Sequence, residues 1–344
     1  IPVGKAVIKF GQIIGYASEP VLAGDHIHTH NCSMGAHDQN YRIGEDFKPV
    51  DHFPEDECPT FMGYRRADGG AGTRNYIALC ATVNCSATVV RRIADHFNHS
   101  SIIDDYPNVD GVIALAHGTG CGIASSGDGY DALQRVLWGH ATHPNVGAAI
   151  FIGLGCEVMQ VGRMKAMFGS SGQERFHGLT IQETGGTRKT IAAGIEAIKA
   201  LLPTVNDVER VPIPISELTL GLQCGGSDGF SGITANPALG AMTDLLVRHG
   251  GTALLSETPE IYGAEQLLVR RAASQEVGEK LIERIRWWEN YSSVNGGSMD
   301  NNPSPGNKAG GLTTILEKSL GAAAKGGSTT LEAVYHYAEP IKAK

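Results

Sequence analysis

The chain has 344 residues, and its formal net charge of −8 corresponds to a pI of about 5.9. It has no basic stripe and only 6% aromatic residues, so the composition argues against a nucleic-acid or anionic-membrane partner. No apolar run approaches the roughly 20 residues of a membrane span, and no signal peptide is visible. The seven cysteines are odd in number and widely spaced, which is typical of reduced thiols in a cytoplasmic protein.

Residues 1–31 predict a small β module. Apolar segments at 6–10 and 13–17 are separated by glycine turns, and residues 26–31 read as a strand with three histidines on one face: His26, His28 and His30. This spacing suits either a metal site or a plain exposed strand face. The following segment, 33–60, loses periodicity and collects Asp, Glu, Pro and His, which predicts an exposed linker.

From about residue 61 apolar strands alternate with amphipathic helices. The predicted strands cover residues 76–83, 112–116, 148–154, 218–222 and 253–256. The predicted helices cover residues 87–97, 130–140, 190–202, 240–249 and 275–291. Pro203 is expected to end the third helix. Strands and helices alternating at this length indicate βαβ units, so the fold class is α/β with a parallel sheet and flanking helices.

Four predicted strands end in a loop that carries a cysteine: Cys85, Cys121, Cys156 and Cys224. Two of these units share a pattern, because residues 107–121 and 144–156 each run from a Pro-Asn-Val turn through a strand to a Gly-X-Gly-Cys exit. Ligands bind beyond the carboxyl ends of the strands in such sheets. Converging thiols there would form a soft site for iron or an iron–sulfur cluster. The alternative is that each cysteine is a small buried hydrophobe.

Two ionisable residues adjoin these loops. His117 can act as a metal ligand or general base, and Glu157 can bind metal or move a proton. The plainer interpretation is that both are satisfied structural side chains.

Three polar segments are candidates for binding an anion. The turn Cys224–Gly229 places Ser227 and Asp228 among glycines, where exposed N–H groups can hold a carboxylate or where Asp228 simply caps a helix. In the loop 301–308, a set of polar side chains can bind hydroxyls and a carboxylate: Asn302, Asn307 and Lys308. Arg74, next to Asn75 before the first central strand, offers another anion site.

Several motifs, in this order, resemble the altronate/galactarate dehydratase family. They lie at residues 63–69, 72–75, 153–157, 223–229, 231–237, 256–257 and 302–308. The resemblance implies a partial β-clip (SAF-like) domain at 1–32, a linker at 33–60, a dimerising central α/β domain at 61–209 and a Rossmann-like α/β domain at 210–344. It also implies that the last domain is incomplete at its C-terminus.

The resemblance further implies dehydration of a hexonic or hexaric acid, such as altronate or galactarate, to a 2-keto-3-deoxy product. Fe(II) is the expected cofactor, with Mn(II) or an iron–sulfur cluster as alternatives, and a homodimer or larger homo-oligomer is expected. A metal would act as a Lewis acid on the substrate carboxylate. The expected metal ligands are Cys85, Cys121, Cys156 and Cys224. The expected catalytic residues are His117, Glu157, Asp228 and Lys308. The expected substrate-binding residues are Arg74, Asn75, Ser227, Asn302 and Asn307.

Other functions compete with this prediction. A sulfolactate sulfo-lyase branch of the same family would expel sulfite instead of water. A nicotinamide-dependent oxidoreductase is a further alternative, although the chain lacks the Gly-x-Gly-x-x-Gly fingerprint and its following acidic residue. A non-catalytic sugar-acid-binding protein is the third.

Overall fold

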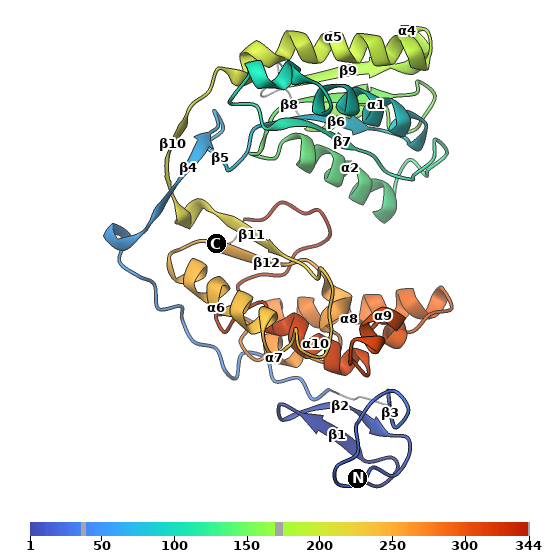
Figure 1. Ribbon diagram of the computed structural model, residues 1–344, viewed down its shortest axis with the longest axis vertical. Helices are drawn as coiled ribbons and strands as arrows, with labels where there is room; N and C mark the ends of the chain where they lie inside the picture. The colour runs from blue at the N-terminus through green and yellow to red at the C-terminus, as the bar shows by residue number, and fades with distance from the viewer. Residues whose placement is uncertain (36–38, 169–174, 343–344) are drawn as a thin grey trace. The chain divides into compact units, whose positions relative to one another are not determined.

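A computed structural model describes residues 1–35, 39–168 and 175–342. The chain divides into two compact units (Figure 1). Unit 1 is formed mainly by Ile1–Pro59 and Pro214–Val334, and unit 2 by Thr60–Ile213 with Tyr335–Ile341. The predicted linker therefore belongs to the same unit as the C-terminal part of the chain.

Unit 2 is built around a four-stranded parallel sheet in the order β7-β6-β8-β9. Its strands are β6 (Tyr76–Ala81), β7 (Gly111–Leu115), β8 (Val146–Gly153) and β9 (Phe176–Thr180). The first three confirm the predicted strands, whereas β9 was not predicted. The α/β class with a parallel sheet is therefore confirmed.

Helices cover both faces of this sheet (Figure 1). They are α1 (Ala87–Asn98), α2 (Asp128–Ala141), α3 (Val161–Phe168), α4 (Ile181–Thr184) and α5 (Thr187–Asn206). Alternate residues of β6 point to opposite faces. Ile77 and Leu79 join the core under α1 and α5, while Ala78 and Cys80 join the core under α2.

The prediction that Pro203 ends its helix was wrong, because α5 continues to Asn206. Proline costs the helix one hydrogen bond and a clash with the preceding turn. On either side of it, Leu202 and Val205 are buried in the unit 2 core. Burial of these two side chains offsets the cost and keeps the last turn helical.

Unit 1 begins with a three-stranded antiparallel sheet formed by β1 (Ala6–Lys9), β2 (Gln12–Ala17) and β3 (Cys32–Ser33). The predicted strand at 26–31 is wrong, since this segment is a turn. The buried Asn31 side chain explains the turn. Its amide oxygen accepts from His28 N at 2.9 Å, and its amide nitrogen donates to His26 O at 3.1 Å.

The rest of unit 1 contains the parallel pair β11 (Thr219–Leu222) and β12 (Thr252–Leu255). Its helices are α6 (Ala235–Arg248), α7 (Gln266–Val269), α8 (Gln275–Val294), α9 (Pro305–Ala309) and α10 (Ile315–Ala324).

A second sheet lies at the start and end of the main segment of unit 2 and was not predicted. It has the order β10-β4-β5, and its strands are β4 (Thr60–Arg65), β5 (Ala71–Gly72) and β10 (Arg210–Pro214). Short 3-10 helices lie at Glu55–Glu57, Asn84–Ser86, Ser101–Asp105, Ile215–Glu217, Thr258–Ile261 and Met299–Asn301. Within the described ranges, no helix is both long and apolar enough to cross a membrane.

The segment that follows the N-terminal sheet makes specific contacts within unit 1. Tyr41 donates from its hydroxyl to Glu265 Oε1 at 2.7 Å, and Arg270 pairs with Asp46. The Ile43 side chain packs directly on Gly278 of α8, so closely that it occupies the space a Cβ at Gly278 would need. The predicted linker therefore has little regular structure but is held against the helices of unit 1.

Close packing of α1 on α5 depends on Gly194, where an added Cβ would lie 2.4 Å from Ile93 Cδ1. Gly194→Ala is expected to lower the free energy of unfolding by about 1–3 kcal/mol through overpacking. Adding Ile93→Val, which removes the clashing methyl group, should recover part of this loss. Chemical denaturation of the two single variants and the double variant measures the coupling. Simple additivity of the two single effects would contradict the contact.

Candidate active site

The carboxyl ends of β11 and β12 bring two loops of unit 1 together. Leu222 and Leu255 are paired at the ends of these parallel strands. The next residues stay in contact, because Cys224 N donates to Glu257 Oε2 at 2.5 Å. This edge of a parallel sheet is where α/β proteins bind ligands.

The first loop is a tight polar turn. Asp228 Oδ1 accepts from the backbone nitrogens of Phe230 (2.9 Å) and Ser231 (2.7 Å). The Cys224 thiol lies 3.0 Å from the Ser227 hydroxyl. Asp228 is exposed, and its Oδ2 makes no hydrogen bond to any residue that the structure describes. One Asp228 oxygen thus shapes the turn and the other is available to a ligand.

A third loop, residues 302–308, joins this turn. Ser304 and Asn307 form a capping box at the start of α9. The Asn307 amide nitrogen then donates to Ser227 O at 2.7 Å, while His28 Nε2 of the N-terminal module donates to Lys308 O at 2.8 Å. The Lys308 side chain is half-buried and, among the residues described, has no carboxylate partner.

Two buried lysines lie behind these loops. Lys318 Nζ is 2.7 Å from both Glu260 Oε1 and Asn302 Oδ1, and the Asn302 amide nitrogen donates to Glu260 Oε1 at 2.8 Å. Lys325 Nζ is 3.5 Å from Glu257 Oε2. Only 5% of each lysine side chain is exposed. The sequence analysis did not predict these pairs. A signal was present, because Lys318 and Lys325 stand in and next to an apolar helix rich in small residues, and a buried lysine needs a polar partner.

A cavity of about 450 Å³ within unit 1 adjoins the first of these loops, and Lys318 of its lining contacts Glu260 and Asn302 of the other two. The turn between β1 and β2, the segment 227–237 and one side of α10 line it. Its polar lining includes Lys9, Gln12, Ser227, Asp228, Glu317 and Lys318. We call this cavity, with the loops 223–231, 256–261 and 302–308, the unit 1 site. It brings together six predicted residues: Cys224, Ser227, Asp228, Asn302, Asn307 and Lys308.

Three predicted metal-ligand cysteines belong to unit 2, where they follow the carboxyl ends of the sheet strands. Their loops are neighbours, since Asn84 N donates to Thr119 O (2.9 Å) and Val158 N to Cys121 O (3.2 Å). Cys85, Cys121 and Cys156 are all exposed. Across the described part of the chain, no three His, Cys, Asp or Glu side chains are grouped so that they could hold a metal ion. The positions at strand ends are as predicted, and the iron site formed by the cysteines stays a prediction.

Glu157 occupies the crevice beside these loops as an internal ligand. It is 3% exposed, and its carboxylate accepts from Thr82 Oγ1 (2.8 Å), Leu154 N (3.2 Å) and Gly155 N (2.6 Å). The boundary between β6 and β8 is the point where the strand order reverses, the usual ligand crevice of an open parallel sheet. Because the Glu157 carboxylate accepts hydrogen bonds from Thr82 and from its own loop, these contacts favour a structural role over the predicted catalytic one.

His117 is likewise engaged on both ring nitrogens. Nε2 donates to Ala81 O at 3.0 Å, and Nδ1 accepts from Thr119 N at 3.1 Å. Burial lowers the pKa of His117 below its usual value, which favours this neutral form. Neither nitrogen is free to ligate a metal or accept a proton in this arrangement.

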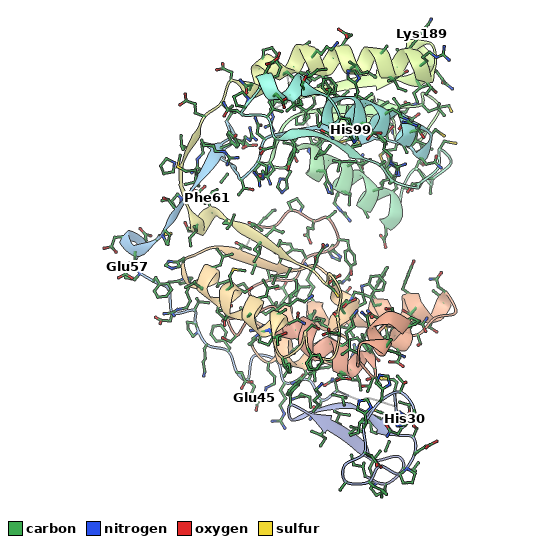
Figure 2. All side chains as sticks on the ribbon, viewed as in Figure 1. His30, Glu45, Glu57, Phe61, His99 and Lys189 are labelled. Carbon is green, nitrogen blue, oxygen red and sulfur yellow. The ribbon has the colours of Figure 1, made fainter. Side chains whose placement is uncertain are left out.

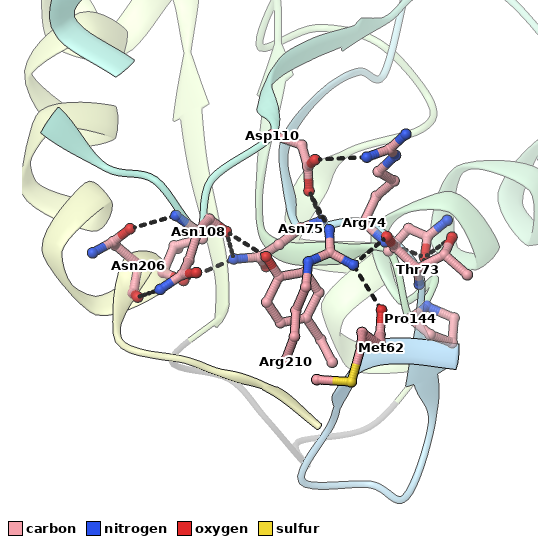
Figure 3. A network of polar contacts seen from close by, with 12 residues as sticks. Met62, Thr73, Arg74, Asn75, Asn108, Asp110, Pro144, Asn206 and Arg210 are labelled. Atoms are coloured by element: carbon pink, nitrogen blue, oxygen red, sulfur yellow. Dashed lines mark hydrogen bonds and ion pairs between the residues drawn. The ribbon is translucent and has the colours of Figure 1, made fainter. Parts of the chain in front are cut away.

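Arg74 and Asn75 lie at the opposite end of the same sheet (Figure 3). The fully buried Asn75 donates from its amide to Asn108 O (2.7 Å) and Val205 O (2.8 Å). Arg74 Nη1 lies 3.2 Å from Asp110 Oδ1. These bonds hold the entry to β6, so the structure does not bring these two residues to the cysteines, which follow the far ends of the strands.

The three histidines of the N-terminal module do come near one another. The His26 ring centroid is 5.6 Å from that of His28, with nearly parallel rings, and 6.5 Å from that of His30. Figure 2 labels His30 on this module. Among the described residues, these histidines do not form a group that could hold a metal ion.

Glu157→Gln is expected to lower the free energy of unfolding by about 1–3 kcal/mol, because one amide oxygen cannot serve three donors. Denaturation with Glu183→Gln, an exposed glutamate on α4, as the matched control measures the difference. Equal stabilities for the two variants would contradict the internal-ligand role of Glu157.

Serine at Cys85, Cys121 and Cys156 together is expected to leave iron uptake unchanged, because these thiols do not converge. Iron per chain, measured after anaerobic reconstitution with Fe(II), should equal that of the unaltered protein and of a Cys58→Ser control. Loss of iron in the triple variant but not in the Cys58→Ser control would show that these cysteines bind the iron.

Three family models match successive parts of the chain. Residues 1–35 match the altronate/galactarate dehydratase SAF domain, which confirms the small N-terminal SAF domain. Residues 63–206 match the D-galactarate dehydratase/altronate hydrolase second domain, and residues 215–344 the D-galactarate/altronate dehydratase C-terminal domain. The unit 1 site thus draws on the first and third of these regions.

Individual relatives agree. Altronate dehydratase of Escherichia coli (strain K12) is 38% identical over 340 residues, which cover 98% of this chain and 67% of the relative. Galactarate dehydratase (L-threo-forming) of the same organism is 35% identical over 342 residues, with coverage of 96% and 64%. The (2R)-sulfolactate sulfo-lyase subunit beta of Chromohalobacter salexigens is 31% identical over 267 residues, with coverage of 76% and 63%. The chain belongs to the altronate/galactarate dehydratase family of hydro-lyases.

Proposed function

We propose that this protein dehydrates a sugar acid, altronate in the first place, to its 2-keto-3-deoxy product at the unit 1 site. The observation that carries the proposal is the meeting of the loops at 223–231, 256–261 and 302–308, joined by the Asn307–Ser227 and Cys224–Glu257 hydrogen bonds. Altronate is preferred because identity is higher to altronate dehydratase (38%) than to galactarate dehydratase (35%).

The reaction places three demands on the site. The proton on C2 must be removed, negative charge on the resulting enediolate must be stabilised, and the C3 hydroxyl must leave with a proton as water. The enol that remains tautomerises to the 2-keto-3-deoxy acid. A C–H bond next to a carboxylate is a very weak acid, so stabilising the enediolate charge is the largest of these demands.

The free groups of the unit 1 site correspond to these demands. Lys308 has no carboxylate partner among the described residues and would bind the substrate carboxylate. Asp228 Oδ2 would carry a proton to or from substrate. Asn302 and Asn307 use their amides on protein partners, so their proposed role changes from binding substrate to positioning the loop.

The cofactor and assembly are proposals taken from the family resemblance. An Fe(II) ion, with Mn(II) or an iron–sulfur cluster as alternatives, would supply Lewis-acid stabilisation of the enediolate. Quantifying iron and sulfide after anaerobic reconstitution decides among them. A homodimer through the central domain is proposed as well, and light scattering on the purified protein measures it.

A sulfolactate sulfo-lyase activity is the second candidate, favoured only by the 31% identity to a sulfo-lyase subunit. Expulsion of sulfite and of hydroxide both follow removal of the proton next to a carboxylate, so the same site chemistry applies. The nicotinamide-dependent oxidoreductase prediction has no support from the family assignment.

The test assays altronate, galactarate and sulfolactate under anaerobic, reducing conditions. Altronate turnover is expected, and Lys308→Met should lower kcat/KM by about 100-fold through loss of charge stabilisation. Lys189→Met, which removes an exposed lysine from α5 in unit 2, is the matched control and should have no effect. Sulfite release without turnover of either sugar acid would replace the proposal with the sulfo-lyase, and equal losses in both variants would contradict the role of Lys308.

A further inference from the structure

Both lysines that line the unit 1 cavity are paired with carboxylates. Its lysines are Lys9 and Lys318, and its carboxylates are Asp228 and Glu317. Lys9 Nζ lies 2.7 Å from Glu317 Oε1, and Lys318 Nζ lies 2.7 Å from Glu260 Oε1. Each lysine of the cavity wall is therefore neutralised by a carboxylate before any ligand enters.

Glu317 is fixed independently of Lys9. Its second oxygen, Oε2, accepts from Thr313 N at 2.8 Å and from Thr313 Oγ1 at 2.6 Å. The Glu317 side chain is 6% exposed, against 34% for Lys9. The carboxylate is thus held by α10 and its preceding residue, and the lysine of the β1–β2 turn reaches it from the more exposed side.

This balance has a consequence for the charge of the ligand. A hexonic acid carries one carboxylate and ends in an uncharged hydroxymethyl group, whereas a hexaric acid carries a carboxylate at each end. Lys308 does not line the cavity, but its neighbour Asn307 donates to the backbone oxygen of Ser227, which does. We therefore place the first carboxylate at Lys308 and the far end of the ligand in the cavity, where both lysines are paired and Asp228 adds negative charge. A second carboxylate in the cavity would lose water without gaining a cation as its partner. Asp228 and Glu317 would also repel it.

We propose that the Lys9–Glu317 pair is a specificity determinant that makes the cavity select sugar acids with a single carboxylate. The proposal rests on the proposed function only in taking sugar acids as the ligands. It assigns a role in substrate choice to the N-terminal SAF module, because Lys9 and Gln12 of that module form part of the cavity wall.

Two substitutions move the charge balance in opposite directions. Glu317→Gln releases Lys9, so the ratio of kcat/KM for altronate to that for galactarate should fall by about tenfold. Lys9→Met leaves Glu317 unpaired, so the same ratio should rise by about tenfold. Loss of stability would lower both rates together and cancel in the ratio. Lys5→Met makes the same charge change in the same module, outside the cavity lining, and should leave the ratio unchanged.

Binding of 3-deoxy-hexonate and 3-deoxy-hexarate, followed by calorimetry, separates this proposal from the proposed function. These acids lack the leaving hydroxyl and cannot be dehydrated, so their ratio of Kd values should shift in the same two directions whether or not altronate turns over. Absence of turnover with shifted Kd ratios would overturn the proposed function and support the selectivity. Ratios that stay constant, or that move the same way in both variants, would overturn the selectivity.

Discussion

The burial of charged side chains on α10 is the constraint on which unit 1 depends. A charge removed from water must be paired, and α10 together with its C-cap carries three such charges in an apolar helix. Glu317 pairs with Lys9 of the N-terminal module, Lys318 with Glu260, and Lys325 with Glu257. One helix thereby fixes the SAF module, the loop after β12 and, through Asn302, the loop at 302–308. The cavity lies between α10, the turn that joins β1 to β2 and the segment 227–237.

The same reasoning applies to unit 2, where the protein's own polar groups engage two of the predicted catalytic side chains. Its parallel sheet has the strand order that forms a ligand crevice in such folds, and the loops after three of its strands carry exposed cysteines. Yet Glu157 supplies its own carboxylate to the Thr82 hydroxyl and to two backbone N–H groups. His117 bonds to Ala81 and Thr119. Groups that resemble catalytic residues in the sequence are used here to close the loops.

The sequence was sufficient for the parts of the fold that depend on periodicity. The central strands and the helices at 87–98 and 128–141 follow their apolar patterns closely. Pro203 and the turn at 26–31 were mispredicted because packing of Leu202 and Val205, and the hydrogen bonds of Asn31, override local signals. For the site, the polar loops were recognised, but Glu260, Lys318 and Lys325 were not. Their ion pairs join segments that are tens of residues apart in the sequence, so a pattern of neighbouring residues cannot predict them.

The central claim is that the ligand binds at the unit 1 site and not beside the unit 2 cysteines. Hydrogen–deuterium exchange with and without 3-deoxy-hexonate tests this directly, because a bound ligand slows the opening of the backbone it contacts. We expect slower exchange of the backbone amides at residues 223–231, 256–261 and 302–308. Exchange should be unchanged at residues 82–86, 116–127 and 154–160. Protection confined to the second group of loops would contradict it and return the active site to the cysteines.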